Sequence, residues 1–199
     1  MMEADVKRTR NFWADMGNIP NLLCIYRIVV LPFLVLLFFS GHYGLTLILA
    51  VLAPLSDLFD GIIARRFNMV TELGALLDIV SDLLFTCVVL LLAVHQGVWP
   101  LYLFLIWSFR DISVLAMRWS SAQLGFAIPS IVLGKISTDF IYVALVIFFL
   151  DVMQPFSSAT GYTAAIHLLG LVLIHIGLGL QWITALVYFR RYYQLYQTT

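Results

Sequence analysis

Four aspartates stand close together in an otherwise apolar stretch of this sequence, DLFDGIIARRFNMVTELGALLDIVSD, residues 57–82. They are Asp57, Asp60, Asp78 and Asp82. The members of each pair are three or four residues apart, so they share one face if their segment is helical. Within a membrane a carboxylate is costly, and four neighbouring ones also repel each other. The pattern therefore predicts a compensating positive charge beside them.

Metal ions are the first candidate for that charge. Carboxylates clustered without cysteine or histidine are the hard oxygen ligands that Mg²⁺ and Mn²⁺ prefer. Four of them suit a pair of divalent cations, and two-metal sites commonly act on phosphate esters. Gly61, Ala64 and Gly74 fall on the same predicted faces and leave room for a planar base or a diphosphate to approach the backbone. Tight helix packing is the alternative reason for these three small residues.

The elements that must position these residues are membrane helices. The 199-residue chain is 62% hydrophobic and 11% charged, with a mean hydropathy of +0.99, so it has too few polar side chains to coat a soluble protein. Apolar runs long enough to cross a hydrocarbon core of about 30 Å recur along it. We place them at about 22–40, 45–64, 74–94, 98–118, 130–150 and 162–188. The sequence therefore predicts an all-α polytopic membrane protein with six transmembrane helices.

The N-terminal segment, MMEADVKRTRNFWADMGN, mixes charged residues with Phe12 and Trp13 and lacks the apolar core of a cleavable signal peptide. It predicts a short interfacial helix with its aromatic side chains at headgroup level, and a disordered tail is the alternative. The chain contains no long linker or low-complexity tract. Residues 1–199 are therefore expected to form a single membrane domain, with 1–18 as its interfacial segment.

Basic residues mark one side of the predicted bundle. They are Lys7, Arg8, Arg10, Arg65, Arg66, Arg118, Lys135, Arg190 and Arg191. The connections on the other side, 41–44, 95–100 and 151–162, contain no lysine or arginine. The positive-inside rule then predicts that both termini, the 65–73 connection and the aspartates lie on the cytoplasmic side. A bacterial cytoplasmic membrane fits the compact size, with a mitochondrial or endoplasmic reticulum membrane as the alternative.

The aspartate stretch resembles the signature of the CDP-alcohol phosphotransferase family, D-x2-D-G-x2-A-R-x8-G-x3-D-x3-D, without a mismatch. The resemblance implies a six-helix, usually dimeric membrane enzyme that moves a phosphatidyl or similar group from a CDP-linked donor to an alcohol and releases CMP. It also implies that the four aspartates bind two divalent cations, Mg²⁺ or Mn²⁺, and that Asp82 deprotonates the acceptor hydroxyl. Gly61, Ala64 and Gly74 would line the nucleotide site, with Arg65 near its phosphates.

Other segments extend the resemblance. NIPNLLCIYRIVVLPF, residues 18–33, is similar to the first helix of the family, with Asn21 and Arg27 at matching places, and Asn21 joins the implied donor site. FRDISVLAMRWSSAQLG and GKIST, which hold Arg110, Arg118 and Lys135, resemble the phosphatidylglycerophosphate synthases of that family. The chain departs from those synthases at Ile79, Leu83 and Ser137, where they carry proline, lysine and lysine.

The acceptor is expected to be a small, phosphorylated alcohol. Arg27, Arg110, Arg118 and Lys135 are all predicted on the cytoplasmic side, where they would form a charge-assisted phosphate pocket. Anchoring of helices at the headgroups by snorkelling is the alternative. The predicted function is transfer of a phosphatidyl group from CDP-diacylglycerol to glycerol 3-phosphate.

Alternatives to this function remain open. Phosphatidylglycerol, giving cardiolipin, inositol phosphate and serine are other acceptors for the same chemistry. An ion-coupled transporter with functional intramembrane aspartates is a more distant alternative. The expected partners are the two substrates, the lipid bilayer and a second copy of the chain in a homodimer, and no nucleic acid is expected to bind.

Overall fold

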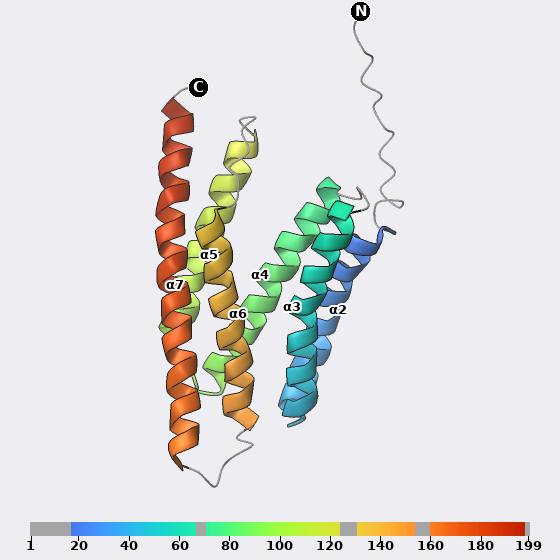
Figure 1. The fold of residues 1–199 in the computed structure, drawn as a ribbon, viewed down its shortest axis with the longest axis vertical. Coiled ribbons are helices and arrows are strands. Elements are labelled where there is room, and N and C mark those ends of the chain that lie inside the picture. Colours follow the sequence, from blue (N-terminus) through green and yellow to red (C-terminus); the bar gives the residue numbers. More distant parts are fainter. Residues whose placement is uncertain (1–16, 67–70, 124–130, 154–159, 198–199) are drawn as a thin grey trace, which may run out of the picture.

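The protein is built from long helices that run along one another (Figure 1). The computed structural model describes residues 17–66, 71–123, 131–153 and 160–197, without the side chains of 19, 20, 57–66, 72 and 160–162. The described helices are α2 (Ile19–Phe39), α3 (Tyr43–Arg66), α4 (Glu72–His95), α5 (Leu101–Gln123), α6 (Val132–Met153) and α7 (Thr160–Gln197). Each predicted apolar segment coincides with one of these helices, so the all-α fold is confirmed.

The largest difference from the predicted boundaries is at the end of α7. This helix has 38 residues, which is about 57 Å at 1.5 Å per residue and nearly twice the thickness of a hydrocarbon core. Apolarity declines at Arg190, but arginine, tyrosine and glutamine are all compatible with a helix, so α7 continues to Gln197. The predicted N-terminal interfacial helix falls outside the described residues except for Gly17 and Asn18, which form a turn and a bend before α2.

Four of the described helices, α2, α4, α6 and α7, are long and apolar enough to cross a membrane. The structure is therefore that of an integral membrane protein with several spans. In α3 only Tyr43–Ser56 qualifies as an apolar segment among the described side chains. Helix α5 is interrupted in its apolar character by Arg110, Asp111 and Arg118.

The helices form two groups that α4 connects. Helix α2 packs against α3 and α4, and the most extensive interface among the described helices joins α6 and α7. Helix α5 packs on α7, and smaller contacts join α3 to α6 and α4 to both α5 and α6. Figure 1 shows α4 leaning from the α2–α3 pair across to the α5–α6–α7 group. This tilt places the first turns of α4 away from the second group.

Tight glycine turns make the neighbouring helices antiparallel. Gly41, between α2 and α3, has a φ of 75°, and Gly97, after α4, has a φ of 69°. Both values lie in the left-handed region that glycine enters without a Cβ clash. The amide of His42 donates to the Leu37 carbonyl oxygen at 3.0 Å, which satisfies an end carbonyl of α2. These turns fix the short connections at the end of the molecule opposite the aspartates.

Helices α6 and α7 approach closely at two glycines of α7. A Cβ atom on Gly177 would lie 2.8 Å from Ile141 Cγ1 and 3.2 Å from the Ser137 carbonyl oxygen. A Cβ on Gly170, two turns earlier, would lie 3.2 Å from Ile147 Cγ2. Small residues of this kind allow membrane helices to gain van der Waals contact, which replaces the hydrophobic driving force in lipid. This spacing holds α7 against α6 over several turns.

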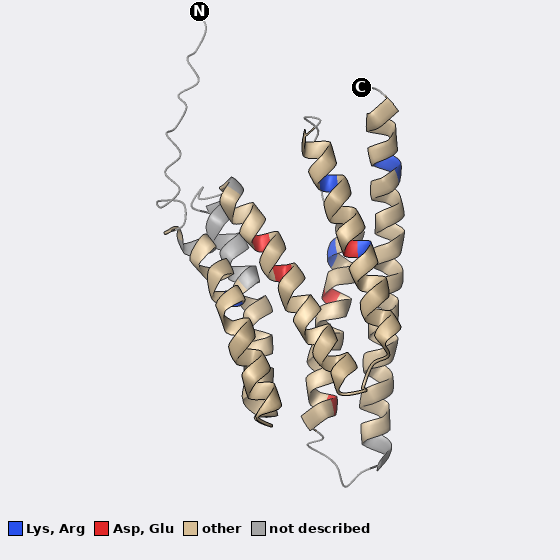
Figure 2. Ribbon diagram, turned by 180° about the vertical axis from the view of Figure 1, so that it is seen from behind, with Lys and Arg blue, Asp and Glu red and all other residues tan. Residues whose placement is uncertain are grey.

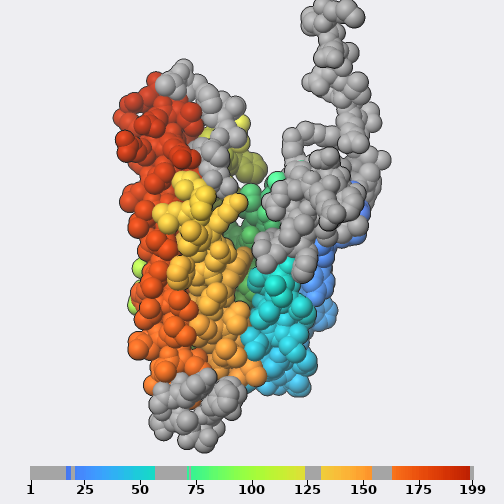
Figure 3. Space-filling model, viewed as in Figure 1, coloured from blue at the N-terminus to red at the C-terminus, as the bar shows by residue number. Residues whose placement is uncertain are grey.

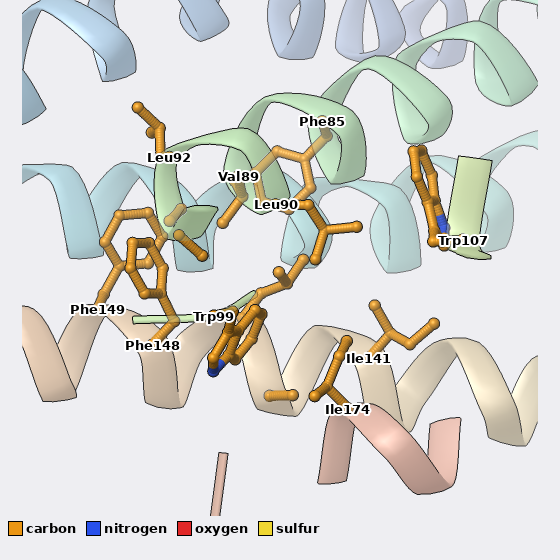
Figure 4. Packing of buried hydrophobic residues seen from close by; sticks show 14 of the residues in the cluster. Phe85, Val89, Leu90, Leu92, Trp99, Trp107, Ile141, Phe148, Phe149 and Ile174 are labelled. Carbon is orange, nitrogen blue, oxygen red and sulfur yellow. The ribbon is translucent and has the colours of Figure 1, made fainter. Parts of the chain in front are cut away.

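The apolar core lies between α4, α5, α6 and α7, with further side chains from α2 and α3. Figure 4 shows aromatic and branched side chains from these helices pointing toward one another. The ring centroids of Phe148 and Phe149 are 4.9 Å apart, and those of Trp99 and Phe148 are 5.7 Å apart. Both distances are within the range of favourable ring pairs. The core thus holds α4 against α5 and α6 against α7, near the end of the molecule where the chain passes from one helix of each pair to the next.

Most of the charged residues that Figure 2 colours on α4, α5 and α6 lie away from this core, in the half of the molecule that contains the C-terminal end of α7. In the space-filling view atoms of α4 are visible beside α6 (Figure 3).

Candidate active site

Asp78 and Asp82 lie one turn apart on α4 and share a single cation, Arg27 of α2. The guanidinium donates through NH1 to Asp82 Oδ1 at 2.6 Å and through NH2 to Asp78 Oδ1 at 3.0 Å. The arginine side chain is only 2% exposed, whereas those of Asp78 and Asp82 are 47% and 37% exposed. Arg27 therefore binds the carboxylates from the protein side and leaves them accessible from the opposite side.

Two further side chains complete the surroundings of Arg27 and Asp82. NH2 of Arg27 also lies 3.3 Å from Cys24 Sγ, one turn earlier on α2. The hydroxyl of Tyr142, from α6, interacts with the Asp82 carboxylate, and its ring packs edge-on against Phe85 at 6.0 Å. Spacing within one helix cannot reveal such a contact from another helix, so sequence reasoning missed Tyr142. Asp82 is thus held from both groups of helices.

The start of α4 is bound to α2 through Asn21. Asn21 is buried, and its Nδ2 donates to Thr71 Oγ1 at 3.2 Å. Thr71 is the N-cap of α4, and its hydroxyl accepts from the Gly74 amide at 3.0 Å. A Cβ on Gly74 would overlap the side-chain oxygen of Asn21. The structure thus brings Asn21 and Gly74 together and gives this glycine a packing reason. Thr71 was missed, although a threonine before an apolar helix is a recognisable cap signal.

The remaining donor-site predictions fall on the last part of α3. Asp57, Asp60, Gly61, Ala64 and Arg65 belong to a continuous helix, so their backbone positions share a face as the spacing requires. Their side chains lie outside the part of the structure that is described. Helix α3 ends at Arg66 and α4 begins at Glu72, so the two aspartate-bearing segments lie on either side of one short connection.

The donor set present on α4 suits a divalent cation. Asp78 and Asp82 are hard oxygen ligands one turn apart and partly accessible, and their two carboxylates outnumber the single positive charge of Arg27. Among the described side chains no three acidic, histidine or cysteine residues gather into a metal-binding group. A complete set would therefore need the aspartates of α3.

Arg110, predicted to bind the acceptor phosphate, is engaged with protein groups at each guanidinium nitrogen. Nε donates to the Gln181 carbonyl oxygen at 3.2 Å, and NH2 donates to Thr184 Oγ1 at 3.0 Å. NH1 forms an ion pair with Asp111 at 2.5 Å. Gln181 and Thr184 are both buried on α7. Arg110 therefore joins α5 to α7 inside the α5–α6–α7 group.

Arg118 and Lys135 lie in the same group of helices but are less constrained. The Arg118 guanidinium carbon is 5.5 Å from the ring centroid of Tyr188 on α7. Lys135 is exposed in the first turn of α6, and within the described ranges its ammonium group makes no ion pair or hydrogen bond. The structure thus divides the four predicted acceptor residues, because Arg27 lies with the aspartates and the other three lie on α5 and α6.

Comparisons with known proteins identify the family of this chain. The sequence model of the CDP-alcohol phosphatidyltransferase family matches residues 17–187. A CDP-diacylglycerol–glycerol-3-phosphate 3-phosphatidyltransferase of Rickettsia typhi is 34% identical over 179 residues, which cover 88% of this chain and 97% of that protein. A protein of the same name from Rickettsia felis is 33% identical over 87% of this chain and 94% of its own length.

A relative from another bacterium matches over a shorter region. The protein of that name from Escherichia coli is 34% identical over 136 residues, which cover 64% of this chain and 74% of that protein. The family match includes residues from every helix that the structure describes. The chain therefore belongs to the CDP-alcohol phosphatidyltransferase family and is a transferase of phospholipid biosynthesis.

Proposed function

We propose that this protein transfers a phosphatidyl group from CDP-diacylglycerol to glycerol 3-phosphate and releases CMP. The observation that carries the proposal is the likeness to the Rickettsia typhi protein, whose name states this reaction and of which the match covers 97%. The access to Asp78 and Asp82 from one side, opposite Arg27, supports it because a reacting group can approach from there.

The donor site is proposed to be the facing surfaces of α3 and α4. Asp57, Asp60, Asp78 and Asp82 would hold two divalent cations, Mg²⁺ or Mn²⁺, in a family whose members generally depend on divalent cations. Bound there, such ions would neutralise the negative charge of the diphosphate as CMP departs. Gly61, Ala64, Arg65, Gly74 and Asn21 would form the surface for the nucleotide. The hydrogen bonds between Asn21, Thr71 and Gly74 support this by fixing the first turn of α4.

Asp82 is proposed to accept the proton of the acceptor hydroxyl, whose oxygen then attacks the phosphorus that carries the diacylglycerol group. The bond from this phosphorus to the CMP oxygen breaks, and CMP leaves with the electron pair. A general base must be held in one orientation to act. Arg27 and Tyr142 provide that orientation from two different helices.

Arg118 and Lys135 are proposed to bind the phosphate of the acceptor. Both are accessible in part and neither has an acidic partner among the described residues. A phosphate with about two negative charges gains charge-assisted hydrogen bonds from two such groups. Arg110 would support this pocket from behind, because its own nitrogens are engaged with α7 and Asp111. Arg27 would reach the acceptor only at the reacting end, beside Asp82.

The proposed architecture is a single domain with six transmembrane helices, in which α3 and α5 also cross the bilayer. Polar side chains on these two helices would face the interior of the bundle, as those of Arg110 and Asp111 do, both being largely withdrawn from the surface. The basic ends of the helices would lie in the cytoplasm of a bacterium, with both termini and the active site on that side. The working form would be a homodimer.

The experiment is an acceptor panel. The purified protein in detergent would be given CDP-diacylglycerol and Mg²⁺ or Mn²⁺, and CMP release measured with glycerol 3-phosphate, phosphatidylglycerol, inositol phosphate, serine and no acceptor. We expect release with glycerol 3-phosphate alone, and none from an Asp82→Asn variant. Release with another acceptor instead would refute the assignment of the acceptor, and silence with all of them would refute the donor.

A further inference from the structure

Tyr188 of α7 contacts Arg118 and the residue just before the helix that carries Lys135, the two basic residues to which we assign the acceptor phosphate. Its side chain is buried, with 4% exposed, in a small apolar cluster separate from the main core. The cluster joins α5, α7 and the residue just before α6. Its members are Val114, Ala185 and Tyr188, with the partly buried Met117, Ile131, Tyr192 and Leu195 packed against them.

The ring of Tyr188 supports Arg118. The guanidinium carbon of Arg118 is 5.5 Å from the ring centroid, within the distance of about 6 Å at which a cation is attracted to an aromatic face. The ring is buried among side chains of α5 and α7, and this packing constrains its orientation. The ring therefore supports the guanidinium, which has no acidic partner among the described residues.

The hydroxyl of Tyr188 supports the helix that carries Lys135. It accepts a hydrogen bond from the Ile131 amide at 3.2 Å, just before α6 begins. The carbonyl oxygen of Ile131 in turn accepts from the Gly134 amide at 2.9 Å and the Lys135 amide at 3.4 Å. One tyrosine on α7 thus contacts the arginine of α5 through its ring and fixes the first turn of α6 through its hydroxyl.

We propose that Tyr188 is a positioning residue that sets the geometry of Arg118 and Lys135, and through them the preference for a phosphorylated acceptor. This inference rests on the proposed function. Two cations must converge on one phosphate to bind it well, and each comes from a different helix. Among the described side chains, Tyr188 contacts both the Arg118 guanidinium and the Ile131 amide that precedes α6. Its contribution is to acceptor recognition and not to the donor or the reacting groups.

The test compares three variants of the full chain in detergent. Tyr188→Leu removes ring and hydroxyl, Tyr188→Phe removes only the hydroxyl, and Tyr192→Phe is the matched control. Tyr192 belongs to the same cluster, but its hydroxyl is hydrogen-bonded to Ser120 at 2.9 Å and not to the Ile131 amide. We expect the KM for glycerol 3-phosphate to rise about tenfold in Tyr188→Leu and about threefold in Tyr188→Phe. The KM for CDP-diacylglycerol should change less than about twofold in both Tyr188 variants. In Tyr192→Phe both KM values should change less than about twofold.

A merely structural role would give a different pattern. Loss of kcat with both KM values changed in parallel, or an unchanged acceptor KM in Tyr188→Phe, would overturn the inference. The phenylalanine variant keeps the ring and the volume, so it decides the question even if the leucine variant does not fold. If the wild-type protein released no CMP with glycerol 3-phosphate, the proposed function itself would be refuted. Failure of the proposed function is therefore distinguishable from failure of the inference about Tyr188.

A double-variant comparison adds an independent readout. If Tyr188 acts through Arg118, then Tyr188→Leu should raise the acceptor KM in an Arg118→Gln background by clearly less than in the wild type, leaving about the effect of the hydroxyl alone, roughly threefold. Equal effects in the two backgrounds would show that the ring does not act through Arg118.

Discussion

The guanidinium of Arg27 lies 2.6 Å from the carboxylate of Asp82, a residue 55 positions later in the chain. With the second contact to Asp78, this ion pair locks α2 to α4. One positive charge faces two negative ones, so the group retains a net negative charge in the half of the molecule where polar residues gather. A site of this kind attracts further cations, and the arginine fixes where its carboxylates point.

Removal of the positive charge at Arg27 should destabilise the protein. Arg27→Gln leaves two neighbouring carboxylates without their counter-charge, and breaking a buried ion pair costs about 3–5 kcal/mol. Because the carboxylates are partly exposed, we expect about 3 kcal/mol. Thermal or denaturant unfolding in detergent, without divalent cations, would measure it. Arg27→Lys keeps the charge and should lose less, and equal losses in the two variants would contradict a role for the charge.

Divalent cations should stabilise the wild-type protein and not its aspartate variants. A ligand at a concentration of 100 times its Kd adds about 2.7 kcal/mol to the free energy of unfolding. The melting temperature should therefore rise with Mn²⁺ or Mg²⁺ and fall back when EDTA removes the metal. Asp78→Asn and Asp82→Asn should abolish this response together with CMP release. Asp151→Asn is the control. Asp151 pairs with His167 of α7 and lies at the far end of α6 from the contact between Tyr142 and Asp82. An aspartate variant that keeps the full response would refute the ligand assignment.

An added methyl group at Gly74 should disturb the start of α4. The Cβ of Gly74→Ala would overlap the Asn21 side-chain oxygen, and overpacking of this kind costs about 1–3 kcal/mol. Unfolding measurements should show this loss, and Gly74→Ala combined with Asn21→Ser should recover part of it. Gly179→Ala is the matched control, since a Cβ there meets no atom within 4 Å. A Gly74 variant as stable as the control would contradict the close approach of α2 and α4.

Arg110 and Lys135 should differ in what their removal changes. Lys135→Gln takes away an exposed charge with no described partner, so stability should hold while the KM for glycerol 3-phosphate rises about tenfold. Arg110→Gln breaks the contacts with Gln181 and Thr184, so the melting temperature should fall. Measurement of acceptor KM and thermal unfolding for both variants checks the difference. A stable Arg110 variant with a raised acceptor KM would instead make Arg110 a phosphate ligand.

Much of the fold could be predicted because a membrane helix must satisfy its own backbone and stay apolar for about 20 residues. The six predicted segments therefore coincide with α2 to α7. The end of α7 could not be found in this way, because beyond Arg190 the helix is no longer limited by the apolar region. The number of membrane crossings is equally hard to read for α5, where charges turned toward α7 look like interruptions of a span.

The spacing of the aspartates predicted which of them share a helix face, and the helical backbone of α3 and α4 agrees. Spacing along one helix says nothing about the partner from another helix. For that reason the contact of Arg27 with Asp82, the approach of Tyr142 and the contact of Asn21 with Gly74 became visible only in the structure. The same limit explains why Arg27 and Arg110 look alike in the sequence but lie in different surroundings.

The most direct measurement follows the acceptor into the lipid product. Purified protein would be incubated with CDP-diacylglycerol, a divalent cation and carbon-13-labelled glycerol 3-phosphate, and the lipids and CMP quantified by mass spectrometry. We expect one labelled phosphatidylglycerophosphate for each CMP, and neither product from Asp82→Asn. CMP without labelled lipid, or labelled lipid from the Asp82 variant at the wild-type rate, would contradict this expectation.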